Sequence, residues 1–70
     1  MANNNSNSIA IKIRKARLQK KMTQVVVAQK SGISETYFAQ IERGEKNPTI
    51  SVISKIIDVL GVSSKDILGK

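Results

Sequence analysis

Apolar residues recur at helical spacing in several separate stretches of this 70-residue chain. In the first stretch, Ile9, Ile13 and Ala16 repeat every three to four positions, as the buried face of a helix does. Lysines and arginines fill many of the remaining positions. The pattern predicts a basic amphipathic helix that runs from an N-cap at Ser8 to about Lys20.

The next stretch, residues 23–43, predicts two short helices joined by a tight turn. Thr23 can cap the first of these helices, and Val27 and Ala28 are its inward-facing residues. Gly32 suits the left-handed conformation in which helices commonly end. The chain can therefore reverse within two or three residues of this glycine.

The second helix of this stretch has an apolar side and a polar side. Ser34 can cap it, while Ile33, Phe38 and Ile41 are expected to enter the core. The outward positions fall on one narrow stripe at 100° per residue and are Thr36, Gln40 and Arg43. Two short helices closed by a small turn are the arrangement that places a helix in the major groove of DNA.

Two further helices follow. A loop at 44–48 contains the only proline, and Thr49 can cap a strongly apolar helix that Gly61 ends. Its length of about twelve residues favours a helix over a strand, despite its many isoleucines. Ser63 and Asp66 have the spacing of a capping box for a short last helix. The whole pattern predicts an all-α fold, a compact bundle of five helices.

The domain boundary is expected near residue 8. Residues 1–7 are rich in asparagine and serine and predict a disordered tail. Residues 8–70 then form one DNA-binding domain with its motif at about 24–43. A leader peptide is not expected, because the N-terminus is polar.

Composition leaves few candidates for enzymatic chemistry. The chain has no cysteine and no histidine, and its five acidic residues do not cluster. It therefore offers no thiol nucleophile, imidazole base or standard zinc site. We expect no enzyme activity, no metal, no cofactor and no small-molecule ligand.

The positive charge is confined to one half of the chain. Residues 1–34 contain seven of the twelve basic residues and none of the acidic ones, whereas residues 35–70 contain five of each sign. A one-sided basic field attracts nucleic acid or an anionic membrane surface. No apolar run approaches the ~20 residues of a membrane span. Double-stranded DNA is the expected partner, and the cytoplasm the expected compartment.

The polar stripe contains the residues that could read bases. Gln40 can pair with adenine, and Thr36 can contact a base or the thymine methyl group. Glu35 can accept from a cytosine amino group or merely favour the positive end of its helix. Tyr37 can contact a phosphate or pack on the helix edge. Gln24, at the start of the preceding helix, is a candidate for a phosphate contact or a cap.

The chain resembles the helix-turn-helix domain of lambda repressor and Cro, the XRE family. The resemblance covers about residues 9–68. The motifs that carry it are Ile13-Arg14 with Arg17, Thr23-Gln24 with Ala28, Ser31-Gly32-Ile33-Ser34, Ile41-Glu42-Arg43-Gly44, Asn47-Pro48 and Leu60-Gly61-Val62.

The resemblance implies that the third helix is the recognition helix. Gln24 and Ser34 would then anchor phosphates, as would Arg43, Lys46 and Asn47 behind that helix. Positions 35–37 and 40 would face the bases. Arg17 and Glu42 match a pair that forms an internal salt bridge in many members of the family, which is a structural role.

The chain departs from the family pattern in three places. Val25 and Val26 replace a polar pair, and their branched side chains disfavour a helix locally. Lys21 stands where glycine is common, which implies backbone strain or a different helix end. Phe38 is bulkier than the usual aliphatic residue.

The leading hypothesis is a transcriptional regulator, in particular a homodimeric repressor that binds a roughly palindromic operator. The expected dimer surface lies around the last two helices, where apolar residues exceed the needs of a small core: Val59, Val62, Ile67 and Leu68. An alternative is a protein-interaction module such as an antitoxin or a partner-binding subunit. Its contact surface would contain Leu18, Val25, Val26 and the C-terminal apolar residues. A third is a membrane-binding peptide built on the first helix.

Overall fold

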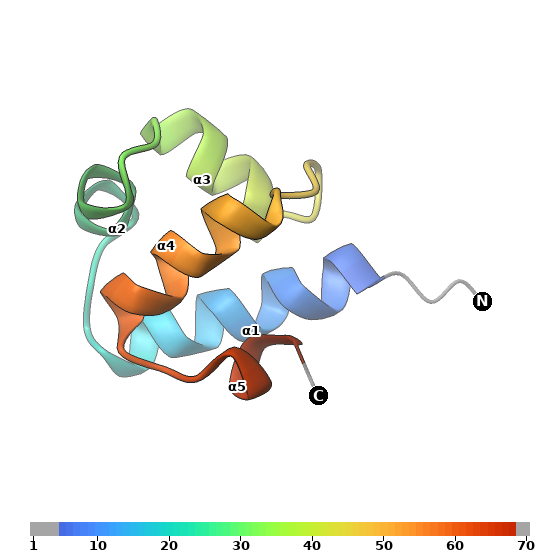
Figure 1. Ribbon diagram of the computed structural model, residues 1–70. Coiled ribbons are helices and arrows are strands. Elements are labelled where there is room, and N and C mark those ends of the chain that lie inside the picture. The colour runs from blue at the N-terminus through green and yellow to red at the C-terminus, as the bar shows by residue number, and fades with distance from the viewer. Residues whose placement is uncertain (1–4, 69–70) are drawn as a thin grey trace.

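In the computed structural model, residues 5–68 are described, with side chains from Ser8 onward. This part of the chain contains α-helices and no strand, which confirms the predicted all-α five-helix fold (Figure 1). The helices are α1 (Asn5–Gln19), α2 (Gln24–Ser31), α3 (Glu35–Glu42), α4 (Ile50–Leu60) and α5 (Ser64–Leu68).

Helix α1 begins earlier than the sequence pattern predicted. It starts at Asn5, so Ser8 lies inside its first turn and is not its N-cap. The predicted tail therefore overlaps this helix at residues 5–7, and the rest of it, residues 1–4, lies outside the described residues. A polar, asparagine-rich segment carries no apolar periodicity that would reveal a helix start.

The caps predicted for the three central helices are confirmed. Thr23, Ser34 and Thr49 each adopt an extended backbone conformation and accept a hydrogen bond from the backbone N–H three residues on. The oxygen-to-nitrogen distances are 3.0 to 3.1 Å. Each cap satisfies a backbone donor that has no partner within its helix.

Four helices end in the same way. Lys21, Gly32, Gly44 and Gly61 all have positive φ, between 58° and 76°. At the end of α1, the Lys21 N–H donates to Leu18 O and the Met22 N–H to Arg17 O, the paired bonds of a Schellman motif. The interpretation of position 21 as a glycine-like site is confirmed. Lys21 is the only described non-glycine residue with positive φ.

One core joins all five helices. Helix α2 packs against α3 and α4, while α1 packs against α3 and α5. The fully buried side chains, each less than 2% exposed, are Ile13, Val27, Phe38, Ile41, Ile56, Leu60 and Ile67. Phe38 thus fits completely inside the core. Helix α3 lies on the side of the bundle away from α5, where its outer face is uncovered (Figure 1).

Not every apolar residue enters this core. Ile67 is only 1% exposed, so it belongs to the core and not to the predicted dimer surface. Val59 and Val62 are partly buried against the core. Ile11 and Leu18 are 61% and 53% exposed on the outer face of α1. The remaining large exposed apolar residues are Val25, Ile50 and Leu68.

Candidate nucleic-acid interface

The uncovered face of α3 carries the predicted base-reading residues. Glu35 and Thr36 are exposed, and Tyr37 and Gln40 are partly exposed, while Phe38 and Ile41 point into the core. The side chains of Glu35, Thr36 and Gln40 form no hydrogen bond or ion pair with any described residue. The polar groups of this face are therefore available to a partner.

A buried ion pair fixes α3 against α1. The Arg17 guanidinium donates to both carboxylate oxygens of Glu42, at 2.6 and 3.1 Å, and to the backbone oxygen of Met22 at 2.9 Å. The side chains of Arg17 and Glu42 are 11% and 2% exposed. The structure thus forms the pair that the family resemblance implies, and the bidentate geometry fixes its orientation.

Gln24 joins the same network. Its side-chain amide donates to Glu42 Oε1 at 3.0 Å, and the residue is half-buried at the first turn of α2. A glutamine amide group has two N–H donors, so one remains for a phosphate oxygen. The sequence motif did not reveal this contact, because its two residues lie 18 positions apart.

Ser34 is placed similarly between a structural role and a binding role. Its Oγ accepts the Tyr37 N–H at 3.0 Å and so caps α3. The hydroxyl hydrogen is not used in that bond and can be donated to a phosphate. The N-terminus of α3 also carries the partial positive charge of the helix dipole, which favours an anion nearby.

Arg43, the predicted phosphate anchor at the end of α3, is already paired. Its Nε donates to Glu45 Oε2 at 2.8 Å, and its Nη2 donates to Glu45 Oε1 at 3.1 Å. This hydrogen bonding raises the pKa of Arg43 and lowers the pKa of the Glu45 carboxyl. Both side chains remain more than half exposed. Sequence reasoning missed Glu45, which had no assigned role.

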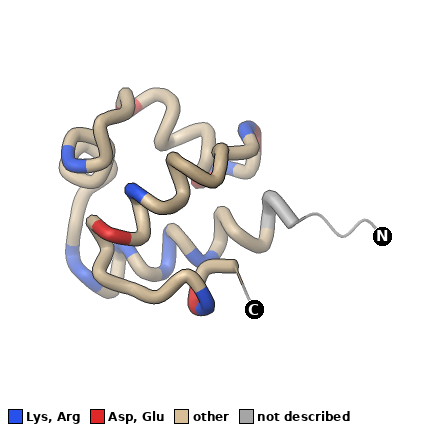
Figure 2. The backbone as a smooth tube through the Cα atoms, in the orientation of Figure 1, with Lys and Arg blue, Asp and Glu red and all other residues tan. Residues whose placement is uncertain are grey.

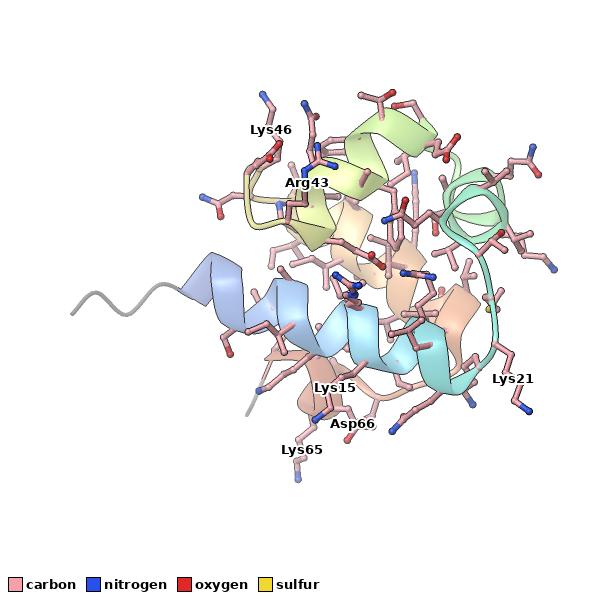
Figure 3. All side chains as sticks on the ribbon, turned by 180° about the vertical axis from the view of Figure 1, so that it is seen from behind. Lys15, Lys21, Arg43, Lys46, Lys65 and Asp66 are labelled. Carbon is pink, nitrogen blue, oxygen red and sulfur yellow. The ribbon has the colours of Figure 1, made fainter. Side chains whose placement is uncertain are left out.

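The remaining predicted phosphate contacts lie in the same loop. Lys46 and Asn47 are exposed just beyond α3. Figure 3 shows Arg43 and Lys46 together beside the end of α3, while Lys15, Lys65 and Asp66 lie at the opposite edge of the molecule. The structure therefore gathers the predicted site on one side, from the start of α2 across α3 to this loop.

Other surfaces carry charge without forming an evident site. Basic residues follow α1 and the turn into α2 (Figure 2). A shallow groove of about 350 Å³ between α1 and α5 is lined by Lys12, Lys15, Ala16, Gln19, Val62, Asp66 and Ile67. In the described part of the chain no group of three or more acidic, histidine or cysteine residues could hold a metal, and none of its helices could cross a membrane.

The five helices, the tight α2–α3 turn and the uncovered polar face of α3 define a helix-turn-helix DNA-binding domain. The helix-turn-helix family matches residues 13–67, and the chain belongs to this family. It is 39% identical over 69 residues to control protein C.BamHI of Bacillus amyloliquefaciens, which covers 97% of this chain and 85% of that protein. It is 33% identical over 63 residues to the immunity repressor protein of Bacillus phage phi105, covering 90% of this chain and 44% of the repressor. The chain thus spans less than half of that relative.

Solved structures agree with this assignment. The wild-type restriction-modification controller protein C.Esp1396I superposes with a TM-score of 0.86 at 34% identity, over 97% of this chain and 87% of that chain. The clp gene regulator ClgR from Corynebacterium glutamicum gives a TM-score of 0.92 at 25% identity, over 97% and 87%. The protein is a DNA-binding transcriptional regulator, as predicted, and its relatives are regulators, not enzymes. The protein-interaction alternative is not favoured.

Proposed function

We propose that this protein is a homodimeric repressor that reads a roughly palindromic operator with α3 of each subunit. The observation that carries the proposal is the outer face of α3, where the side chains of Glu35, Thr36 and Gln40 form no hydrogen bond or ion pair with any described residue. Thr36 and Gln40 lie on this face at helical spacing, so both can meet base edges from one groove. Glu35 and Tyr37 flank them.

The backbone anchors surround this reading face. Gln24 and Ser34 would each donate one remaining hydrogen to a phosphate at the N-terminal side of the motif. Arg43, Lys46 and Asn47 would hold the strand at the other end. Contacts on both sides of α3 would fix its register in the groove, which phosphate contacts do without reading sequence.

Dimerisation is proposed through α4 and α5. Leu68 is 36% exposed there, and Val59 and Val62 are only partly covered by the core. A two-fold dimer would place its two α3 helices in successive major grooves, roughly 34 Å apart. The proposed compartment is the one that contains the DNA, the cytoplasm.

Selection of bound duplexes from a random pool tests the proposal. The expected product is a motif with two inverted half-sites about one helical turn apart. Affinity for it should fall steeply between low and moderate salt, because phosphate contacts release counterions. A pool without enrichment, or binding that is flat with salt, contradicts the proposal. A single half-site without symmetry contradicts the dimer only.

A narrower version of this function is favoured by the comparisons. C.BamHI and C.Esp1396I, which match along most of their own length, are a control protein and a restriction-modification controller protein. We therefore propose that this chain regulates the genes of a restriction-modification system. The selected motif should then lie upstream of restriction or modification genes in the source genome. Its absence there would contradict this narrower proposal.

A further inference from the structure

The turn after α3 pairs Arg43 with Glu45 by its own backbone geometry. Gly44 adopts a left-handed conformation with φ of 76°, and the Glu45 N–H donates to Gln40 O at 2.9 Å. The chain thereby folds back on itself, and the carboxylate at position 45 meets the guanidinium two residues before it. The contact uses Nε and Nη2 of the guanidinium. Three of its five N–H donors remain for another acceptor.

This pair has little to do with stability. The side chains of Arg43 and Glu45 are 56% and 52% exposed. Ion pairs this exposed contribute little to folding, because water screens them and two long side chains must be ordered. The pair does, however, determine where the Arg43 guanidinium points, and Arg43 stands in the proposed phosphate-binding loop. Its effect is therefore expected in DNA binding.

An unpaired arginine at this position would bind indiscriminately. Its long, flexible side chain could reach a phosphate in almost any register of the duplex, which adds affinity without sequence information. Held by Glu45, the guanidinium presents its free edge in one direction only. The Glu45 carboxylate also repels a phosphate that approaches from other directions. A duplex docked in the cognate register is the one that brings a phosphate to the free edge.

We propose that Glu45 determines the specificity of DNA binding without contacting DNA, by withholding Arg43 from phosphates of duplexes that are not in the cognate register. The inference rests on the proposed function, and it adds a residue with a defined role. The effect of Glu45 should differ between the selected operator and a random-sequence duplex. Specific binding should depend weakly on Glu45, and non-specific binding strongly.

The test compares affinities for the selected operator and for a random-sequence duplex at one salt concentration. Glu45→Gln should raise the affinity for random duplex by roughly twofold to fivefold, the scale of one exposed charged contact. Affinity for the operator should change less than about twofold, so the ratio of the two falls. The salt slope on random duplex should steepen by about one, as one further phosphate is contacted.

Two controls separate this role from net charge. Gln29→Lys makes the same change in net charge at an exposed position of α2 outside the proposed interface and should leave the ratio unchanged. In an Arg43→Ala background, Glu45→Gln should no longer change the ratio, since the proposed action passes through Arg43.

Several results would overturn the inference. These are an equal gain on both duplexes, a loss on both, the same fall in ratio for Gln29→Lys, or an effect that persists without Arg43. If the wild-type protein binds no duplex, the proposed function itself fails, and the inference fails with it. If the wild type binds its operator and Glu45→Gln changes neither affinity, only the inference fails.

Discussion

The side-chain amide of Gln24 donates a hydrogen bond to the Glu42 carboxylate, which also receives both hydrogen bonds of the Arg17 pair. One buried carboxylate thus joins the first turn of α2, the last turn of α3 and the last turn of α1. Gln24 is a proposed phosphate anchor and α3 the proposed reading helix, so a single hydrogen-bond network holds the two next to each other.

Removing the charge of Glu42 should strongly destabilise the fold. In Glu42→Gln the buried Arg17 guanidinium loses its counter-charge, which should cost about 3 kcal/mol of unfolding free energy. Urea denaturation measures this loss. Glu45→Gln makes the same chemical change in the exposed pair and should leave the denaturation midpoint almost unchanged. Similar losses for the two variants would contradict the structural role of Glu42.

Lys21→Gly should stabilise the protein. A left-handed conformation costs a non-glycine residue roughly 1–2 kcal/mol, and glycine returns about 0.5–1 kcal/mol of this through its flexible unfolded state. A gain of about 0.5–1 kcal/mol is expected from denaturation curves. Lys20→Gly removes the same side chain next to it, where φ is not positive, and should destabilise. A loss at both positions would show that Lys21 is not strained.

Ser31→Ala should also stabilise the protein. Ser31 is 2% exposed, and its Oγ has no hydrogen-bond partner among the described residues. Removing an unsatisfied buried hydroxyl should raise the free energy of unfolding by about 1 kcal/mol, in addition to the gain from the helix preference of alanine. Ser54→Ala on the exposed face of α4 measures that preference alone, about 0.5 kcal/mol. If Ser31→Ala shows no excess over this control, the hydroxyl is satisfied in solution.

Gln40→Ala should weaken recognition at one base position of the operator. A side chain paired with a base contributes about 1–3 kcal/mol of discrimination against the wrong base. The variant should therefore bind operators that differ at that position with nearly equal affinity. Affinity for random duplex should hardly change. Gln29→Ala, an exposed glutamine on α2 outside the proposed interface, should leave both affinities intact. An equal loss of affinity for all duplexes would show that Gln40 contacts the DNA backbone and does not read a base.

The carboxyl of Glu45 should titrate below its ordinary value. Hydrogen bonds from Arg43 lower its pKa from 4.5, and the charges of Arg43 and Lys46 add to this effect. The pair therefore stabilises the fold above the ordinary pKa, and this contribution is lost as pH falls through the lowered value. Carbon chemical shifts of the Glu45 carboxyl, followed against pH, should show the pKa rising in Arg43→Ala. An unchanged pKa would show that the pair is not formed in solution.

Local chemistry predicted the helices well, because caps and helix ends depend on single residues. Thr23, Ser34 and Thr49 cap as expected, and Gly32 ends α2 in the left-handed conformation. Lys21 shows that position can outweigh residue type, since the turn requires positive φ whichever residue is present. The start of α1 was missed for the opposite reason, because asparagines provide no apolar period.

The partners of the interface residues could not be predicted in this way. Gln24 meets Glu42 only after the helices pack, and Arg43 meets Glu45 only because Gly44 turns the chain back. The sequence pattern placed Ile67 among the surplus apolar residues, whereas the packing of α5 against α1 and α4 buries it in the core. Such contacts depend on tertiary geometry, which residue patterns along the chain do not contain.

The separation on α3 between the proposed base-reading side chains and those that hold the fold has an evolutionary consequence. Glu35, Thr36 and Gln40 make no described side-chain hydrogen bond or ion pair, whereas Phe38, Ile41 and Glu42 on the same helix hold the fold. Substitutions at the first three positions can accumulate without crossing a stability threshold. A lineage with this domain can acquire a new operator by a few changes on one helix face, and diverging copies can stop competing for each other's sites.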